Sequence, residues 1–333
     1  MRGWPILAAF LIAAPSLARR ASEPGTPYLV TDLDPRVAAS TDRSTLGLPT
    51  GFVPMADGLA FAAGDLEHGR ELWWSDGATA RLLADLDSRP GCGSEPFGLT
   101  PLGDRLLCFT QSPGMTYRLW SVGMGGDAVE LASFPLGHSW FRPTAVYAGE
   151  DRFYFSADDM VHGPELWGTD GTPQGTRIAA ELAPGPGGVG IVSAAFWNGS
   201  LYVQATDPPL SILGRLWRID ADGTATPMCP ASTNYFGVSY GGAMAALDDR
   251  LFFFHTGPGA GESLWSTDGT PEGSRIEVRL LDDGSFGLAS KTMGNAAGRL
   301  FVGADFGAFT LEHPGGEPAY LPLEWADWIG PLG

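Results

Sequence analysis

Residues 165–172 read Glu-Leu-Trp-Gly-Thr-Asp-Gly-Thr, and residues 263–270 read Ser-Leu-Trp-Ser-Thr-Asp-Gly-Thr. A third copy, Glu-Leu-Trp-Trp-Ser-Asp-Gly, occupies residues 71–77. Two degenerate copies of the Leu-Trp pair bring the total to five. The tryptophans of the five copies are spaced by 47, 47, 50 and 48 residues, and they are Trp73, Trp120, Trp167, Trp217 and Trp265. A unit of 40–50 residues is the length of one four-stranded propeller blade.

Each unit carries further strand signals at the same period. An apolar run lies upstream of every tryptophan, and tight-turn pairs such as Asn198-Gly199 precede most of these runs. The runs are residues 59–61, 107–109, 153–155, 201–203, 251–253 and 300–302. A further apolar strand follows the tryptophan, as in residues 81–86, 128–134, 177–182 and 275–281. No helical apolar period is present. We therefore predict an all-β fold, a β-propeller of about six four-stranded blades, with seven as the alternative.

Composition and charge agree with a sheet-rich domain. Of 333 residues, 44% are hydrophobic, which is ample for a core, and 47 are Gly and 27 Pro, as expected for a chain with many turns. The formal net charge of −18 argues against a nucleic-acid partner, because phosphate binding needs clustered Lys and Arg. The acidity suits a protein outside the cytoplasm or a surface that resists aggregation.

The N-terminus reads as a signal peptide over residues 1–18. Arg2 precedes the apolar stretch of residues 4–14, and Ser16 and Ala18 supply small residues for cleavage. The stretch is too short to span a membrane, and no other segment of about 20 apolar residues occurs, so we expect no transmembrane segment. The predicted location is the periplasm, the cell surface or the extracellular space.

The remaining chain divides by composition and repeat pattern. Residues 19–27 are interpreted as a linker, residues 28–323 as the propeller and residues 324–333 as a C-terminal tail. Residues 28–34 resemble the fourth strand of a unit, and we expect this strand to pair with the last unit and close the ring. The last unit is a degenerate copy around residues 309–311 that has lost its tryptophan.

Two segments, residues 165–176 and 263–274, together with the stretch from Phe155 to Gly163, closely resemble the ELWxxDGT repeat proteins of bacterial genomes. The resemblance covers about residues 28–323, although Trp120 lacks the following Asp-Gly turn. It implies an exported or surface repeat protein. It implies no enzymatic activity that could be transferred residue by residue.

The repeated residues have structural and functional interpretations. We interpret the five tryptophans as packing between blades, with stacking of a sugar as the alternative. The aspartate that lies three residues after four of the five tryptophans, Asp220 included, is interpreted as a turn residue that binds backbone N–H groups while glycine takes a positive φ. These turn residues are Asp76, Asp170, Asp268, Gly77, Gly171 and Gly269. Calcium is the alternative, with Asp220 and Asp222 as the nearest match to a calcium loop.

Two histidines and two glutamates near the repeated tryptophans are further candidate site residues. His68 and His162 precede two of the tryptophans by five residues, and we expect both to be solvated loop residues. We expect Glu71 and Glu165 to be surface residues too, each facing an arginine of a neighbouring blade.

Cys92 and Cys108 are close enough in sequence to form a disulfide, which would leave Cys229 unpaired, and a buried free Cys108 is the alternative. Three cysteines without a C-x-x-C pair do not indicate a zinc site.

We therefore predict an exported, non-catalytic propeller that binds a protein or glycan or serves as a surface or matrix scaffold. A lectin-like propeller is the first alternative and a secreted hydrolase the second. No catalytic residue and no cofactor are predicted, apart from calcium as above. The sequence does not specify the oligomeric state or the ligand.

Overall fold

The structure is a computed structural model that describes residues 49–89, 92–112, 116–135, 142–206, 214–229, 243–256, 262–280, 292–304 and 307–321. Four predicted segments lie outside these residues: the signal peptide 1–18, the linker 19–27, the additional strand 28–34 and the tail 324–333. In the described part of the chain, no helix is long and apolar enough to cross a membrane.

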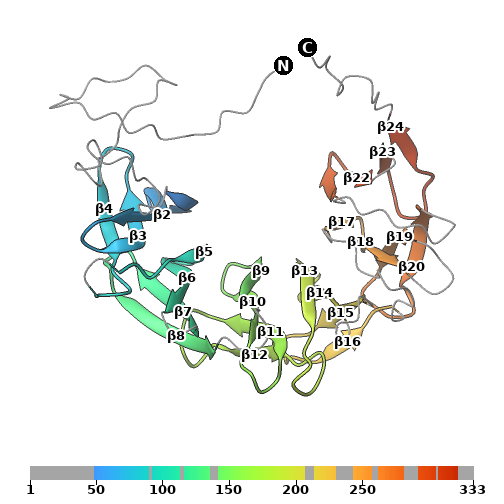
Figure 1. The fold of residues 1–333 in the computed structure, drawn as a ribbon. Coiled ribbons are helices and arrows are strands. Elements are labelled where there is room, and N and C mark those ends of the chain that lie inside the picture. The colour runs from blue at the N-terminus through green and yellow to red at the C-terminus, as the bar shows by residue number, and fades with distance from the viewer. Residues whose placement is uncertain are drawn as a thin grey trace, which may run out of the picture. The chain divides into compact units, whose positions relative to one another are not determined.

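The described residues form six four-stranded antiparallel sheets in which consecutive strands are neighbours (Figure 1). The strands of the first three sheets are β1 (Thr50–Met55), β2 (Gly58–Asp65), β3 (Gly69–Ser75), β4 (Ala80–Ala84), β5 (Phe97–Leu102), β6 (Arg105–Ser112), β7 (Thr116–Gly123), β8 (Ala128–Pro135), β9 (Thr144–Ala148), β10 (Phe153–Asp158), β11 (Pro164–Thr169) and β12 (Arg177–Ala180). The strands of the last three are β13 (Gly190–Trp197), β14 (Ser200–Thr206), β15 (Gly214–Ile219), β16 (Ala225–Pro227), β17 (Met244–Leu247), β18 (Arg250–Thr256), β19 (Glu262–Thr267), β20 (Arg275–Arg279), β21 (Thr292–Ala296), β22 (Arg299–Ala304), β23 (Gly307–Leu311) and β24 (Ala319–Leu321). The predicted all-β fold with six four-stranded propeller blades is confirmed.

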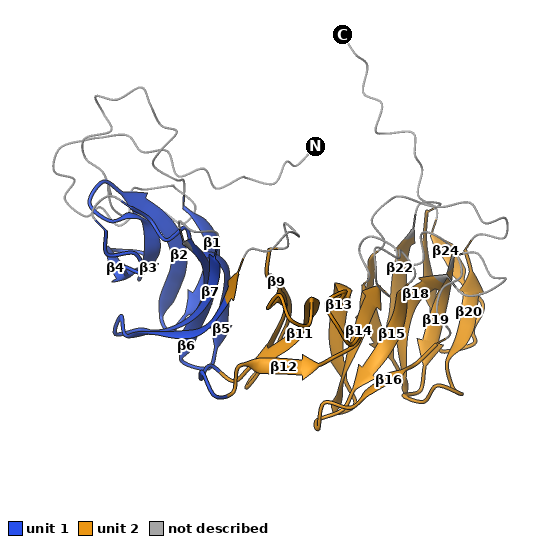
Figure 2. Cartoon of the chain, turned by 60° about the horizontal axis from the view of Figure 1, so that its bottom comes forward, with its two compact units in different colours: residues 1–133, 171–174 blue, residues 134–170, 175–333 orange. Residues whose placement is uncertain are grey.

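The chain divides into two compact units, residues 1–133 with 171–174 and residues 134–170 with 175–333 (Figure 2). The first two sheets belong to the first unit, except for the last two residues of β8, and the other four sheets belong to the second. Within each unit, the first strands of successive sheets contact one another: β1 contacts β5, and β9, β13, β17 and β21 make contacts in series.

Tight turns join the first and second strands of the sheets. Asn198 and Gly199, between β13 and β14, have φ angles of 50° and 81°, and positive φ at both central residues is the requirement of a type I′ hairpin turn. The Asn-Gly pair was predicted as a turn for this reason, and its backbone has that conformation.

The sheets pack on one another through a repeated exchange of side chains. Within the first unit, Leu72 of β3 packs with Leu106, Cys108 and Val122 of the second sheet, and Trp120 lies against the same cluster. The second unit repeats this arrangement, because the Leu of one Leu-Trp pair packs with the tryptophan-bearing face of the next sheet. Burial of these faces supplies the hydrophobic stabilisation of each unit.

Candidate functional site

The Asp-Gly-Thr segments form turns held by their own aspartates. Asp268 Oδ1 accepts hydrogen bonds from the backbone N–H of Thr270 at 2.9 Å and from its hydroxyl at 2.7 Å. Asp76 Oδ1 likewise accepts the N–H groups of Ala78 and Thr79, at 2.8 and 2.7 Å. These hydrogen bonds lower the pKa of both carboxyls. Gly269 follows with a φ of 94°, where a side chain would be strained.

The two calcium candidates have protein partners. Asp220 accepts a hydrogen bond from Ser200 Oγ at 3.0 Å and forms an ion pair with Arg218 at 3.1 Å, whereas Asp222 accepts the N–H of Thr224 at 2.9 Å. Among the residues that the structure describes, no group of three or more His, Cys, Asp or Glu is placed to hold a metal ion. Calcium binding therefore stays an untested prediction.

The five repeated tryptophans lie between neighbouring side chains of the sheets. Trp73 and Trp265 are buried, and the other three are half-buried. Trp265 packs with Tyr202 and Leu216 of the preceding sheet. The ring of Trp167 lies 5.1 Å from that of Phe134 in an edge-to-face contact. Contacts of this kind occupy much of the ring surface that a sugar would need on Trp167 and Trp265.

Glu71 is buried, so the expectation that it lies on the surface opposite an arginine was wrong. Its side chain is 0% exposed, and its carboxylate accepts the N–H of Leu86 at 3.0 Å and the N–H and hydroxyl of Ser94 at 2.7 and 2.6 Å. Burial raises the pKa of Glu71, and the three hydrogen bonds partly oppose this increase. Glu71 therefore fastens the segment that connects the first two sheets.

Glu165 makes the corresponding contacts in the third sheet, and the surface prediction was wrong for it as well. It is also 0% exposed, and it accepts the N–H groups of Leu182 and Ala183 at 2.9 and 3.0 Å. Burial again raises its pKa. We call each buried Glu and the backbone N–H groups that it binds a connector clamp.

A glycine makes each clamp sterically feasible. A Cβ at Gly69 would overlap Gly93 of the connecting segment, and a Cβ at Gly163 would overlap the backbone of Pro186 and Gly188. Both glycines have positive φ, 71° and 73°. The shared sequence His-Gly-x-Glu-Leu-Trp is thus explained by close backbone approach followed by a buried carboxylate.

His68 and His162 occupy matched turns before the clamps. Nδ1 of His68 lies 2.9 Å from Oδ2 of Asp65, and Nδ1 of His162 lies 2.7 Å from Oδ2 of Asp159. The hydrogen bond to the aspartate raises the pKa of each imidazole. Each aspartate also accepts backbone N–H groups of its turn, so each pair stabilises the turn that it belongs to.

All three cysteines are free thiols, and the disulfide considered for Cys92 and Cys108 is not formed. Cys108 and Cys229 are buried. Burial raises the pKa of Cys229 to about 11 and that of Cys108 still further, so neither thiol is ionised near neutral pH.

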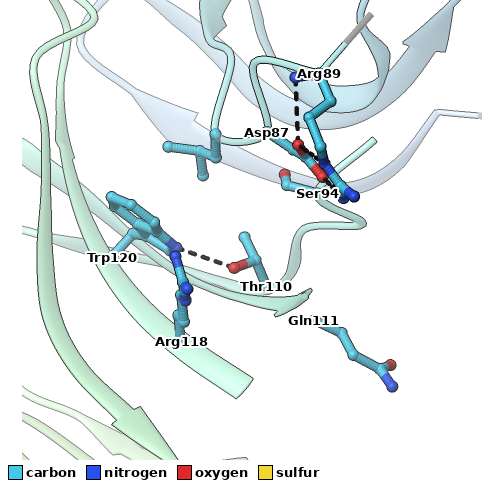
Figure 3. A pocket seen from close by; sticks show the side chains of 8 residues that line it. Asp87, Arg89, Ser94, Thr110, Gln111, Arg118 and Trp120 are labelled. Carbon is cyan, nitrogen blue, oxygen red and sulfur yellow. Dashed lines mark hydrogen bonds and ion pairs between the residues drawn. The ribbon is translucent and has the colours of Figure 1, made fainter. Parts of the chain in front are cut away.

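A cavity of about 220 Å³ lies in the first unit, and none of its polar lining residues was singled out as a ligand contact from the sequence. One wall is the connecting segment after β4, with Asp87, Arg89 and Ser94, and the other is formed by β6 and β7, with Thr110, Arg118 and Trp120 (Figure 3). We call this cavity the connector pocket.

Both walls of the connector pocket are fixed. Ser94 donates its N–H and hydroxyl to Glu71, and its carbonyl accepts the N–H of Gln111 at 3.2 Å. On the opposite wall, Nε1 of Trp120 donates to Oγ1 of Thr110 at 2.9 Å. The pocket is therefore largely preformed, as small-molecule sites usually are.

The charged residues of the pocket differ in how closely they are paired with groups of opposite charge. Asp87 accepts hydrogen bonds from both Nε, at 2.7 Å, and Nη2 of Arg89, and the hydrogen bonds from Arg89 lower its pKa. Arg118 forms an ion pair with Glu130 over 3.4 Å, and its buried Nε has no hydrogen-bond partner in the part of the chain that the structure describes. In the sequence, the one indication of this site is Arg118, which stands where two of the three best repeat copies have Glu.

A second surface feature is an aromatic pair in the second unit. Tyr147 and Phe196 are the next-to-last residues of β9 and β13, and their rings stack with centroids 6.2 Å apart. Phe196 is 51% exposed. Tyr147 is half-buried, so Phe196 is the ring of this pair that a lectin-like surface would present.

No family model and no curated protein matches the chain. Solved structures match at low identity. A puromycin-hydrolyzing peptidase of Mycobacterium tuberculosis is 14% identical with a TM-score of 0.46, and the match covers 85% of this chain and 45% of the peptidase. TolB of Acinetobacter baumannii is 14% identical with a TM-score of 0.36, over 81% of this chain and 67% of TolB. An uncharacterized protein of Listeria monocytogenes is 8% identical with a TM-score of 0.46, over 84% and 83% of the two chains. The chain thus spans about half the length of the peptidase.

Proposed function

We propose that this chain is an exported β-propeller that binds a small ligand without altering it chemically, and that the connector pocket holds the ligand. The observation that carries the proposal is a preformed cavity of about 220 Å³ whose lining residues converge from one connecting segment and two strands. Largely preformed cavities with a few convergent polar groups are the usual form of small-molecule sites.

The contrast with the repeated polar residues supports the proposal. Glu71, Glu165, Asp76 and Asp268 all bind groups of their own chain. Arg118 departs from the repeat, faces the pocket and is partly exposed, with a weak ion pair to Glu130. Function is expected where the repeats differ, because the shared residues serve the fold.

The test is a thermal-shift screen of the full chain against sugars, organic acids and amino acids. A ligand at 100 times its Kd should raise the melting temperature by on the order of 5 °C. Leu86→Trp, at a half-buried lining residue of the connecting segment, should fill the pocket and abolish the shift. Val129→Trp adds the same bulk at an exposed residue outside the pocket and should leave the shift unchanged. Equal shifts for both variants would refute the assignment of the pocket.

The stacked pair of Tyr147 and Phe196 favours a second candidate, a lectin-like surface in the second unit. Aromatic faces attract sugar rings through their apolar C–H groups, and Phe196 is exposed enough to stack one. A glycan array should then show binding that Phe196→Ser removes and Phe301→Ser retains, because Phe301 is another exposed aromatic residue, at 41% exposure. Equal glycan binding by wild type and Phe196→Ser would reject this candidate.

We also propose that the chain is exported and that it is one of the ELWxxDGT repeat proteins. The supports are the charged and apolar pattern of residues 1–18 and the repeat copies at residues 165–176 and 263–274. Mass spectrometry of the protein secreted by a bacterial host should find an N-terminus at residue 19. An uncleaved chain retained in the cytoplasm would contradict export.

A further inference from the structure

We propose that the connector pocket binds a uronic acid, a sugar ring that carries a carboxylate, and that Arg118 binds the carboxylate. This inference rests on the proposed binding function and specifies the ligand of the same site. It is carried by the charge of the lining, by the partly exposed guanidinium of Arg118 and by the size of the cavity.

The lining has an excess of positive charge on an acidic protein. The chain has 20 basic residues and 38 acidic ones, yet the lining contains two arginines, Arg89 and Arg118, and one carboxylate, Asp87. Because Arg89 binds both oxygens of Asp87, the negative charge of this carboxylate is largely neutralised. The arginine that remains, Arg118, makes the pocket attractive to an anion.

Arg118 has donors to spare. Its ion pair with Glu130 joins two side chains that are 41% and 38% exposed, over 3.4 Å, and such exposed pairs are weak. Because the Arg118 side chain is partly exposed and lines the pocket, a ligand in the pocket can reach its guanidinium. A guanidinium presents parallel N–H groups that match the two oxygens of a carboxylate, so a carboxylate ligand would satisfy it better than a neutral one.

Size and lining favour one sugar ring. Pockets for drug-sized ligands measure roughly 300–1,000 Å³, and the connector pocket is smaller, at about 220 Å³. The hydroxyls of Ser94 and Thr110 lie around it, and Trp120 supplies an aromatic wall (Figure 3). Ring hydroxyls would pair with these polar groups, and the ring C–H groups would contact the indole.

Isothermal titration calorimetry of the full chain with three ligands tests the inference. Glucuronate carries both the ring and the carboxylate, glucose has the ring alone, and lactate has a carboxylate without the ring. We expect glucuronate to bind at least 10-fold more tightly than either of the others, since a charge-assisted pair to arginine contributes about 10- to 100-fold in affinity.

Substitutions then locate the contact. Arg118→Gln should lower glucuronate affinity about 10- to 100-fold. Arg118→Lys keeps the positive charge but lacks the paired N–H groups of a guanidinium, so its affinity should lie between those of the wild type and Arg118→Gln. Arg215→Gln changes the residue at the same place of the fourth sheet and should have no effect. Circular dichroism of each variant checks that the fold is retained, as expected for the partly exposed Arg118.

The outcomes separate the two proposals. If glucose matches glucuronate, or if lactate does, the uronic acid is wrong while the pocket still binds ligands. If Arg118→Gln and Arg215→Gln weaken binding equally, the role of Arg118 is wrong. If neither these ligands nor any compound of the thermal-shift screen binds in a manner sensitive to Leu86→Trp, the proposed function itself fails.

Discussion

Glu71 and Arg118 stand at the same place of two consecutive sheets, two residues before the repeated tryptophan, and they serve the same connecting segment differently. Glu71 is buried and binds Leu86 and Ser94 of that segment. Arg118 is partly exposed and faces the segment across the connector pocket. One position thus builds the fold in the first sheet and lines a cavity in the second.

The difference lies in what each side chain does with the connecting segment. The clamp holds the connecting segment in place, because the buried N–H groups of the segment need an acceptor. The next sheet then has a rigid surface opposite its own strands, and a residue that departs from the repeat can face it. Because Arg118 stands where Glu71 stands in the first sheet, the second sheet presents a cation to the wall that the clamp of the first sheet holds.

The largest expected difference between the two positions is in stability. Glu71→Ala leaves two buried N–H groups and a hydroxyl without their acceptor, so it should lower the free energy of unfolding by about 2–4 kcal/mol. Arg118→Ala removes an exposed ion pair and should cost less than about 1 kcal/mol. Urea denaturation of the two variants measures both values. Equal losses would break the distinction between clamp and pocket.

The clamp in the third sheet gives an independent measure of the same energy. Glu165→Ala removes the acceptor of two backbone N–H groups, those of Leu182 and Ala183, and should cost about 2–3 kcal/mol. This variant should keep its affinity for any ligand of the connector pocket, whereas Glu71→Ala, which frees the pocket wall, should lose it. Calorimetry on both variants makes the comparison. A loss of affinity in Glu165→Ala would show that the effect is one of general stability.

The sequence was sufficient for the fold because the repeat reports period-two strands and turn residues locally. It was insufficient for the clamps. Glu71 was expected at the surface because the other copies have Arg or Ser in its place. Its partners lie 15 and 23 residues further along the chain. Backbone N–H donors carry no residue signature, so nothing in the sequence announces them. The pocket was missed for the opposite reason, since Arg118 looked like a degraded repeat.

The pH dependence of stability should be opposite for a clamp and a turn. Burial raises the pKa of Glu71 above its ordinary 4.5, so its contribution is full below that value and declines as the pH rises through the folded pKa. The penalty of Glu71→Gln should therefore be larger at pH 4 than at pH 8.

The pKa of Asp76 is lowered, so its contribution is present above 3.8 and is lost as the pH falls. The penalty of Asp76→Asn should shrink toward pH 3. Denaturation midpoints across pH 3–8 test both signs, and the same trend for the two variants would contradict the assignment.

The smallest expected effect concerns the turn that precedes the first clamp, where Asp65 pairs with His68 and the second sheet has no counterpart in sequence. The hydrogen bond to Asp65 raises the pKa of His68 above 6.5, so its contribution is full below pH 6.5 and vanishes as the pH rises through the folded pKa. His68→Gln should cost less than about 0.5 kcal/mol at pH 6 and nothing at pH 9, because the pair is partly exposed. Asp65→Asn should cost more at both pH values, since Asp65 also accepts the N–H groups of Glu67 and His68. If His68→Gln lowered the free energy of unfolding equally at pH 9, the imidazole would stabilise the turn by packing instead of by charge.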